Sequence, residues 1–229
     1  MSEGPEGRTG GVLVISPHAD DEVLGCVSWL DPEATVFYCG VDDFHVVGRE
    51  ERLREIEAVG DLLGFEWEVG DFTVNRYSER FFDLVQALEK AIDATRPEVL
   101  LLPSPSHNQD HRAVHEAGQV ATRHHDRNFF VPRVLLYEGP DNYLAQTWPF
   151  VPNYFRRLDA ERKIAANALH KSQLRGHRAP NLLRSMAAHR GHQAGLDAAE
   201  AFMVTRWIDA GGRCRECEPP ATPERQSQP

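Results

Sequence analysis

Apolar runs of strand length alternate along this chain with segments whose apolar residues recur at helical spacing. The run at 98–104, "EVLLLPS", has an apolar centre without polar alternation, as expected of a strand that is covered on both faces. Helical spacing is clear at 48–64, where Leu53, Ile56 and Val59 share one face. The expected strands are 11–16, 34–41, 65–71, 98–104, 132–139 and a short one at 153–158, and the expected helices are 48–64, 78–97, 110–125 and 159–174.

This alternation predicts an α/β fold with a Rossmann-like, mostly parallel sheet, helices on both faces and a single domain. A chain of 229 residues that is 41% hydrophobic is large enough to build one such core. We expect the domain to span 11–210, between a flexible segment at 1–10 and a polar, disordered tail at 211–229. The apolar runs are too short to cross a bilayer and the chain starts without the apolar region of a secretory signal, so we expect a cytoplasmic protein.

Charge and cysteine content narrow the classes of partner. A formal net charge of -10 argues against sequence-independent binding of nucleic acid and favours a small-molecule substrate. The four cysteines do not resemble a disulfide framework, and we expect reduced thiols. Cys214 and Cys217 form a C-x-x-C, but the neighbouring sequence lacks a second pair of zinc ligands. The sequence leaves the formation of a homo-oligomer open.

Two clusters of histidine and acidic residues follow two of the expected strands. The segment 17–22, "PHADDE", follows the first strand, and the segment 106–118, "SHNQDHRAVHEAG", follows the strand at 98–104. Crowded carboxylates destabilise a fold unless a cation neutralises them. In open parallel sheets the ligand site lies at the carboxyl ends of the strands, so both clusters are expected at one edge. The ionisable residues of the first cluster are His18, Asp20, Asp21 and Glu22.

Together the two clusters supply a set of metal ligands. His18, Asp21 and His111 provide two imidazoles and one carboxylate, which zinc hydrolases use while leaving a position open for water. A single histidine in such a segment is more often an ordinary polar loop residue, so the prediction depends on the coincidence of two clusters. We expect a single divalent ion per chain, Zn²⁺ in the first place, with Fe²⁺ or another divalent metal as the alternative.

The motif "PHADDE", followed by "DHRAVH" at 110–115, resembles the LmbE/PIG-L family of zinc-dependent N-deacetylases. Supporting similarity lies in "RLREIEAVGDLLGF" (52–65), "ERKIAANALHKSQ" (161–173) and "HRGHQAGLDAAEAF" (189–202). Members of this family remove the acetyl group from N-acetylglucosamine units, and some cleave related amides. The resemblance implies a metal-dependent hydrolase acting on an N-acetylated amino sugar or glycoconjugate.

Carried onto matching positions, the resemblance implies that His18, Asp21 and His111 bind the metal and that Asp20 is the general base. Such a base takes the proton of the attacking water while the metal polarises the amide. Glu22 and Asp110 are expected to support neighbouring residues of the site rather than to touch the metal.

The second cluster departs from the family at one position. Many members have H-P-D-H there, and the first of these histidines assists catalysis. Asn108 stands at the corresponding position of this chain, with His107 displaced by one residue. An amide can donate a hydrogen bond to a developing oxyanion but supplies no proton, which leaves the general acid open.

The remaining candidates concern the substrate. Arg52 matches the family's R-x-x-E and would reach sugar hydroxyls or a phosphate, unless it forms a solvated ion pair with Glu55. Asp71 follows the third expected strand and is a second candidate for substrate binding. The family often has a Thr-(Asp/Asn)-Gly turn where this chain reads "GVDDF" at 40–44, so the substrate rim is expected to differ. His189 and His192 are candidates for closing over the site.

Three alternatives stay open at this point. The same site would serve an amidase acting on another amide. A non-catalytic carbohydrate-binding or regulatory protein on the same fold is the second alternative, although the presence of Asp20 argues against it because binding needs no base. A dinucleotide-binding protein is the weakest of these alternatives, because "PHADDE" follows the first strand in place of a glycine-rich phosphate loop.

Overall fold

A computed structural model describes residues 11–41, 47–124, 129–145 and 148–209 of the chain. Apolar segments of the sequence form the strands, and all five residues of the run Val99–Pro103 are buried. The strands are β1 (Val12–Ser16), β2 (Ala34–Tyr38), β3 (Glu66–Val69), β4 (Val99–Pro103), β5 (Arg133–Tyr137), β6 (Tyr154–Arg157) and β7 (Ala199–Trp207).

These strands form one sheet in the order β3-β2-β1-β4-β5-β7-β6. The first five strands of this order pair in parallel, whereas β7 runs antiparallel to both β5 and β6. The structure therefore confirms the single α/β domain with a mostly parallel sheet. Because the chain leaves β1 toward β2 and later returns to β4 on the other side, β1 and β4 mark the point where the strand order reverses.

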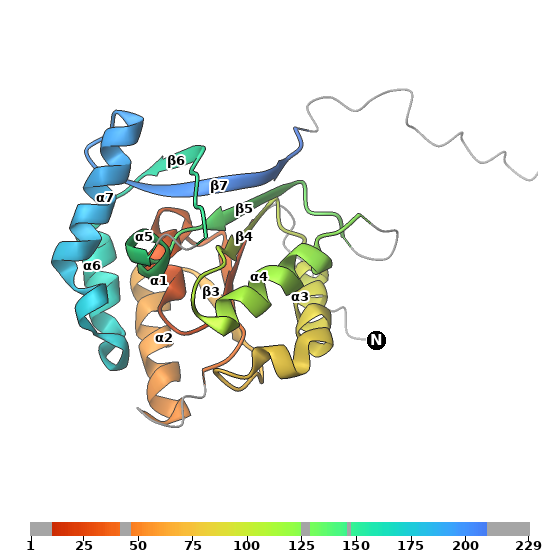
Figure 1. The fold of residues 1–229 in the computed structure, drawn as a ribbon. Coiled ribbons are helices and arrows are strands. Elements are labelled where there is room, and N and C mark those ends of the chain that lie inside the picture. Colours follow the sequence, from red (N-terminus) through yellow and green to blue (C-terminus); the bar gives the residue numbers. More distant parts are fainter. Residues whose placement is uncertain (1–10, 42–46, 125–128, 146–147, 210–229) are drawn as a thin grey trace, which may run out of the picture.

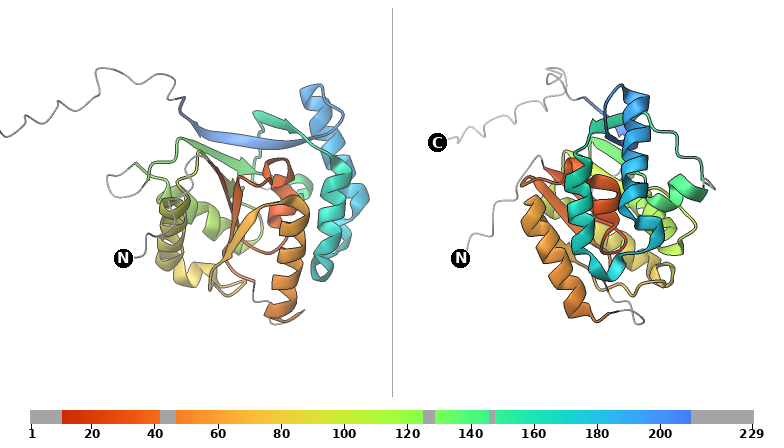
Figure 2. Two further views of the ribbon diagram at one scale, coloured as in Figure 1. Left: turned by 180° about the vertical axis from the view of Figure 1, so that it is seen from behind. Right: turned by 90° about the vertical axis from the view of Figure 1, so that its left-hand side faces the viewer.

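Helices cover both faces of the sheet, as Figures 1 and 2 show. Alternate residues of β1 point to opposite faces: Val14 packs with the helices α1, α2, α6 and α7, while Leu13 and Ile15 pack with α3 and α4. The helices are α1 (Asp21–Cys26), α2 (Arg49–Leu63), α3 (Phe81–Thr95), α4 (Gln109–Ala121), α5 (Pro140–Ala145), α6 (Ala160–Leu169) and α7 (Pro180–Ala194).

Two glycines let the helices that begin at the candidate site lie close to the sheet. A Cβ atom added to Gly25 of α1 would lie 2.4 Å from the Tyr137 ring, and one added to Gly118 of α4 would lie 2.6 Å from Leu102. Both distances are shorter than a nonbonded contact allows, so a larger residue would push either helix away. These contacts hold α1 and α4 close to the sheet.

Several expected boundaries were wrong beyond residue 130. The helix expected at 159–174 ends at Leu169, and two short 3-10 segments follow, η3 (Lys171–Gln173) and η4 (Gly176–Arg178). Neither α7 nor β7 was predicted as an element. β7 begins with Ala-Glu-Ala, which favours a helix, yet it pairs along both edges with β5 and β6. Tertiary pairing therefore overrides local preference in this strand.

Other expectations fall on parts of the chain that the structure does not describe. The segments 1–10 and 211–229, with Cys214 and Cys217, and residues 42–44 of the "GVDDF" stretch lie outside the described residues. Cys26 and Cys39 are buried free thiols, in agreement with the expectation of reduced cysteines. No helix in the described ranges has the length and apolar character needed to span a membrane. The domain limits, the cytoplasmic location and the oligomeric state stay predictions.

Candidate active site

The two histidine and acidic clusters meet at the carboxyl edge of the sheet. β1 ends at Ser16 and leads through a short loop into α1, whereas β4 ends at Pro103 and leads into α4. β1 and β4 are hydrogen-bonded neighbours, so their loops emerge side by side at the point where the strand order reverses. The amino ends of both helices point at this place, and their partial positive charges favour acidic side chains there.

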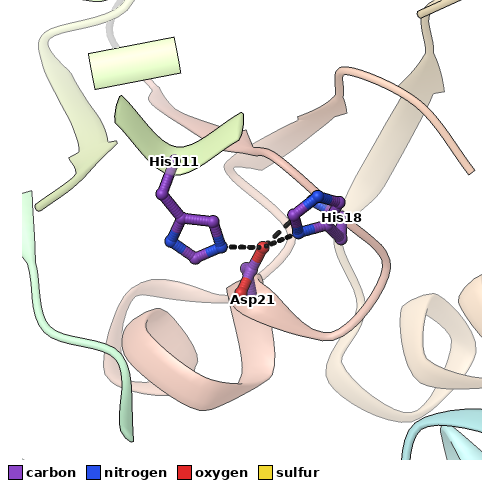
Figure 3. Close-up of side chains that lie close together, drawn as sticks. All are labelled: His18, Asp21 and His111. Carbon is purple, nitrogen blue, oxygen red and sulfur yellow. Dashed lines mark hydrogen bonds and ion pairs between the residues drawn. The ribbon is translucent and has the colours of Figure 1, made fainter. Parts of the chain in front are cut away.

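His18, Asp21 and His111 converge on one point of this edge (Figure 3). Asp21 Oδ2 lies 3.2 Å from His18 Nδ1 and 3.2 Å from His111 Nε2, and the three ligand atoms all lie within 4.8 Å of one another. A tetrahedral zinc site with bonds of about 2.1 Å places its ligand atoms roughly 3.4 Å apart. The three side chains therefore have the donor types and the spacing that a divalent ion requires.

Asp110 orients His18 from the far side of its ring. Asp110 is fully buried, and its Oδ2 accepts a hydrogen bond from His18 Nε2 at 3.0 Å and another from the Asn75 backbone N–H. Its Oδ1 accepts from the Tyr77 backbone N–H at 3.4 Å. Because a carboxylate only accepts hydrogen bonds, Nε2 carries the proton that Asp110 binds. The other ring nitrogen, Nδ1, faces Asp21 and is the atom that would bind a metal. Asp110 therefore orients His18 and lies outside the group of His18, Asp21 and His111.

Electrostatics in the cluster match a cation-binding site. Burial alone would lower the pKa of His18, but its hydrogen bonds to Asp110 and Asp21 raise the pKa to about 9. Burial alone would raise the pKa of Asp21, but the charge of His111 and hydrogen bonds from both histidines hold it well below its usual range. A proton on His18 thus supplies positive charge beside Asp21, and a divalent ion would take its place.

Asp20 lies beside this cluster, and its carboxylate is completely buried. Its backbone has a φ of 116°, which a residue with a side chain rarely adopts, and its N–H donates to Glu22 Oε2 at 2.9 Å. Burial is the main reason why the pKa of Asp20 rises to about 7; the charge of Arg178 opposes the rise and that of Asp21 adds to it. Asp20 Oδ1 has no hydrogen-bond partner among the described residues, which leaves one oxygen available to accept a proton.

Glu22 acts on the site through its neighbours. Its Oε2 holds the backbone of Asp20, and its Oε1 pairs with His170 Nε2 at 2.7 Å. Both Glu22 and His170 are completely buried. The pKa of His170, which burial alone would lower, is raised because the Glu22 carboxylate lies beside it. Glu22 therefore stabilises the strained turn at Asp20 and ties it to the segment that follows α6.

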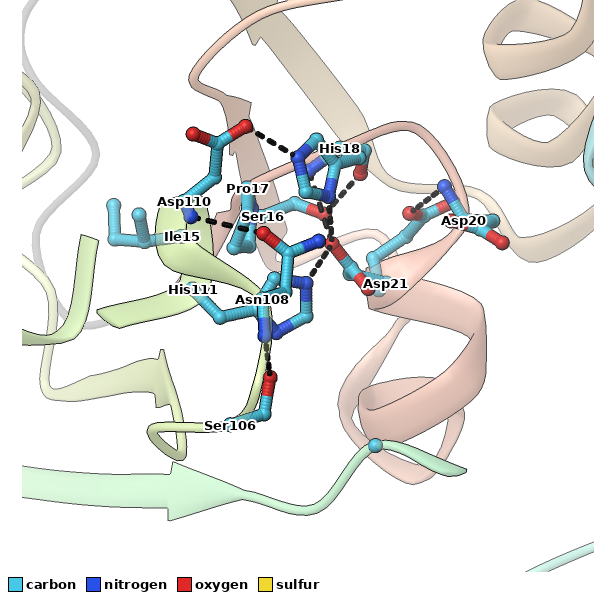
Figure 4. Close-up of polar contacts among 12 residues, drawn as sticks. Ile15, Ser16, Pro17, His18, Asp20, Asp21, Ser106, Asn108, Asp110 and His111 are labelled. Atoms are coloured by element: carbon cyan, nitrogen blue, oxygen red, sulfur yellow. Dashed lines mark hydrogen bonds and ion pairs between the residues drawn. The ribbon is translucent and has the colours of Figure 1, made fainter. Parts of the chain in front are cut away.

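Asn108, drawn in Figure 4, and its neighbour His107 differ sharply in position. Asn108 is the N-cap of α4: its side-chain oxygen accepts from the Asp110 N–H at 2.9 Å, and its amide nitrogen lies on the side of His18 and Asp21. His107 is exposed, and its ring packs edge-on against Trp148 at 5.6 Å between ring centres. The structure thus brings Asn108, and not His107, next to His18 and Asp21.

A cavity of about 160 Å³ opens beside the cluster. Arg52 lines it, and this arginine is 1% exposed, so the alternative of a solvated surface pair with Glu55 is wrong. Arg52 Nη1 donates to Ser172 Oγ at 2.8 Å, while Glu55 accepts from the Ser172 N–H at 2.8 Å. The lining residues are His18, Ala19, Gly40, Val41, Arg52, Val74, Asn75, Asn108, Gln173, Arg175 and Arg178.

The other candidates lie apart from this cavity. The Asp71 side chain is 80% exposed, pairs with Arg80 at 3.3 Å and does not line the cavity. His189 lines a separate cavity of about 600 Å³ between α5 and α7, together with Tyr143 and the ion pair of Arg190 with Glu138. His192 is exposed near the end of α7. Sequence reasoning missed Arg178, His170, Asn75 and Tyr77, which reach the site from distant segments without a local motif.

Comparison with solved structures places this fold among known proteins. The conserved protein TT1542 from Thermus thermophilus is 23% identical, with 88% of this chain and 97% of that chain covered and a TM-score of 0.71. The N,N'-diacetylchitobiose deacetylase from Pyrococcus horikoshii is 21% identical, with coverages of 86% and 84% and a TM-score of 0.67. The hydratase GalB from Pseudomonas putida KT2440, which acts on 4-carboxy-2-hydroxymuconate, is 17% identical, with coverages of 89% and 99% and a TM-score of 0.67.

Further structures with this fold include the A40926 pseudoaglycone deacetylase and teicoplanin deacetylases, one of them in a zinc-inhibited form. Neither a protein-family model nor a curated protein sequence matches the chain. The resemblance to the LmbE/PIG-L deacetylases is therefore confirmed at the level of the fold, which this chain shares with several deacetylases and with at least one hydratase.

Proposed function

We propose that this protein is a metal-dependent hydrolase that removes the acetyl group from an N-acetylated amino sugar or glycoconjugate. The observation that carries the proposal is the cluster of His18, Asp21 and His111 directly beside the buried, half-unpaired carboxylate of Asp20. Metal ligands and a base at one sheet edge are the parts that amide hydrolysis requires. The deacetylases among the structural neighbours support this choice of reaction.

The proposed metal is Zn²⁺, with Fe²⁺ as the alternative, held by His18 Nδ1, Asp21 Oδ2 and His111 Nε2. A bound divalent ion polarises an amide carbonyl and lowers the pKa of a water molecule toward neutrality. The carboxylate of Asp20 would accept the proton of the attacking water through its unpaired Oδ1. Its pKa of about 7 suits proton transfer in both directions near neutral pH.

Hydrolysis also needs a donor for the developing oxyanion and a proton for the leaving amine. The amide nitrogen of Asn108 faces the cluster and is placed to donate a hydrogen bond to the oxyanion. Asn108 has no proton to give, so Asp20 would return the proton it took from water to the amine nitrogen as the C–N bond breaks. Asp110 would keep His18 in the orientation that binding requires.

The cavity beside the cluster is the proposed place for the sugar. Arg52 lines this cavity and would donate to sugar hydroxyls or to a phosphate, although it also anchors Ser172. Asp71 stays a candidate for the outer rim only, because its exposed side chain does not line the cavity.

The test combines metal exchange with a panel of amides. Protein stripped by a chelator is reloaded with Zn²⁺ or Fe²⁺, since one structural neighbour has a zinc-inhibited form. Acetate release is then measured with N-acetylglucosamine, N,N'-diacetylchitobiose, N-acetylglucosamine glycosides and an N-acetylated amino acid. We expect metal-dependent release from an amino sugar. Release from the amino acid alone would favour the amidase alternative, and no release at full metal occupancy would contradict a deacetylase and favour a binding protein.

A further inference from the structure

An arginine from a distant segment reaches the proposed base. Arg178 belongs to η4, 158 residues from Asp20 in the sequence, and its Nη1 donates a hydrogen bond to Asp20 Oδ2. The same nitrogen lies 3.0 Å from Gln173 Oε1. The Arg178 side chain is 18% exposed, while that of Asp20 is completely buried. The guanidinium of Arg178, which lines the cavity, therefore contacts the carboxylate of the proposed base. Neither the sequence motifs nor the similar structures indicate this contact.

Arg178 is held in place by more than this one contact. Its backbone carbonyl accepts a hydrogen bond from Asn167 Nδ2 on α6 at 3.2 Å. Upstream, Ser172 is bound by Arg52 and Glu55 of α2, and His170 by Glu22. The segment from His170 to Arg178 is thus hydrogen-bonded to α1, α2 and α6. These bonds fix the position from which Arg178 reaches Asp20.

The contact divides the two oxygens of Asp20 between two tasks. Oδ2 is occupied by Arg178, whereas Oδ1 has no partner in the described part of the chain. A carboxylate buried beside Asp21 and Glu22 would otherwise turn away from them. A planar guanidinium at one oxygen restrains this rotation.

We propose that Arg178 is a positioning residue of the reaction: it holds Asp20 Oδ2 so that Oδ1 faces the attacking water. This inference rests on the proposed function, because it assigns to Arg178 a role toward the base of that reaction. Arg178 touches neither the metal ligands nor, in this role, the substrate.

The experiment measures steady-state deacetylation and metal content of Arg178→Ala and Arg178→Lys, with the wild type and Arg184→Ala as references. Arg184 pairs with Glu161 on the surface between α6 and α7 and serves as a matched arginine that contacts no residue of the site. We expect Arg178→Ala to lower kcat by roughly 10- to 100-fold, since a misplaced group costs about that much, with KM and metal content unchanged. Arg178→Lys should lose less, because it keeps the charge without the planar fork.

A second measurement separates positioning from a merely structural role. Low millimolar guanidinium chloride should restore part of the lost kcat of Arg178→Ala, while equal sodium chloride should not, and Arg184→Ala should respond to neither. A higher kcat in Arg178→Ala would mean that the arginine blocks the base, and this would overturn the inference. If Arg178→Ala loses metal or thermal stability and guanidinium does not restore its kcat, the positioning role is also overturned. In that event a wild-type kcat in Arg178→Lys would confirm a structural role.

These outcomes are distinct from failure of the proposed function. If the metal-loaded wild type releases no acetate from any amide, the proposed reaction falls and the role of Arg178 falls with it. If the wild type is active and both Arg178 variants turn over at its rate, only the inference about Arg178 is refuted.

Discussion

Two of the buried clusters of charged residues in the described part of the chain differ in how completely their hydrogen bonds are satisfied. Between α1, α6 and β7, Glu200 accepts from Lys163 at 2.8 Å and from the backbone N–H groups of Val27 and Ser28. Lys163 also donates to the Leu24 carbonyl at 2.7 Å. Every oxygen of Glu200 has a partner and the charges balance, as expected of a structural ion pair.

The cluster at the carboxyl edge of the sheet is built in the opposite way. Three acids, Asp20, Asp21 and Glu22, follow one another, and Asp20 Oδ1 has no partner among the described residues. Two histidines lie beside Asp21, where a cation would fit. A buried group with unused bonding capacity lowers stability unless something else binds it, so such a group points to chemistry. The comparison shows that a structural cluster differs from a functional one less in burial or charge than in whether every polar atom has a hydrogen-bond partner.

The largest effect is expected from removing a metal ligand at the edge cluster. His111→Ala leaves two ligands, and a three-ligand site has no spare donor, so the variant should lose bound metal and deacetylase activity together. The measurement is elemental analysis of the purified variant beside an acetate assay. Full metal occupancy in His111→Ala would remove this residue from the ligand set, and His18→Ala should behave like His111→Ala.

The structural cluster should respond in stability instead of activity. Lys163→Met leaves the charge of Glu200 buried without its partner, which should lower the free energy of unfolding by about 3–5 kcal/mol. Denaturant unfolding measures this loss. Arg184→Ala, which breaks an exposed ion pair with Glu161, is the control and should unfold nearly like the wild type. If Lys163→Met unfolds like the wild type but loses metal or kcat, the division between the two clusters is wrong.

Asp20→Asn should distinguish the role of the proposed base from that of the proposed metal ligands in the edge cluster. The amide keeps the shape of the side chain but accepts no proton, so kcat should fall by roughly 10²-fold or more while the metal is retained. Metal content and kcat are measured on the same preparation. Loss of metal would show that Asp20 is a ligand in place of Asp21, and turnover near that of the wild type would leave the reaction without the proposed base.

The fold was predictable from the sequence wherever a local pattern decides the structure. β1 and β4 are apolar runs with turn residues behind them, and α2 has a clear apolar face that ends before Gly64, whose φ is 89°. The end of α6 has no such signal. "ALHKSQL" continues in helix formers, yet the helix stops where His170 turns inward to pair with buried Glu22. A distant partner decides this boundary, and local spacing carries no information about it.

The same distinction applies to the candidate site. His18, Asp20 and Asp21 lie close together in the sequence where β1 ends and α1 begins, so their types and spacing were visible together, and strand order brings His111 to them. Arg178 belongs to a segment that carries no motif, and it meets Asp20 only through the packing of α6 and η4. Contacts of this kind depend on tertiary structure, because the local sequence around an arginine does not predict which residue it contacts.

The smallest effects are expected at the amino end of α4, where Asn108 faces the cluster and His107 packs on Trp148. Removing one donor to a developing oxyanion costs about 10²- to 10³-fold in kcat, and Asn108 also caps α4, so Asn108→Ala should lower kcat by about 10²-fold. His107→Ala should lower it less than about tenfold, since the exposed ring packs on Trp148. Steady-state rates of both variants at equal metal content test this ranking. The reverse ranking would show that His107 swings into the site during turnover and supplies the proton that we assign to Asp20.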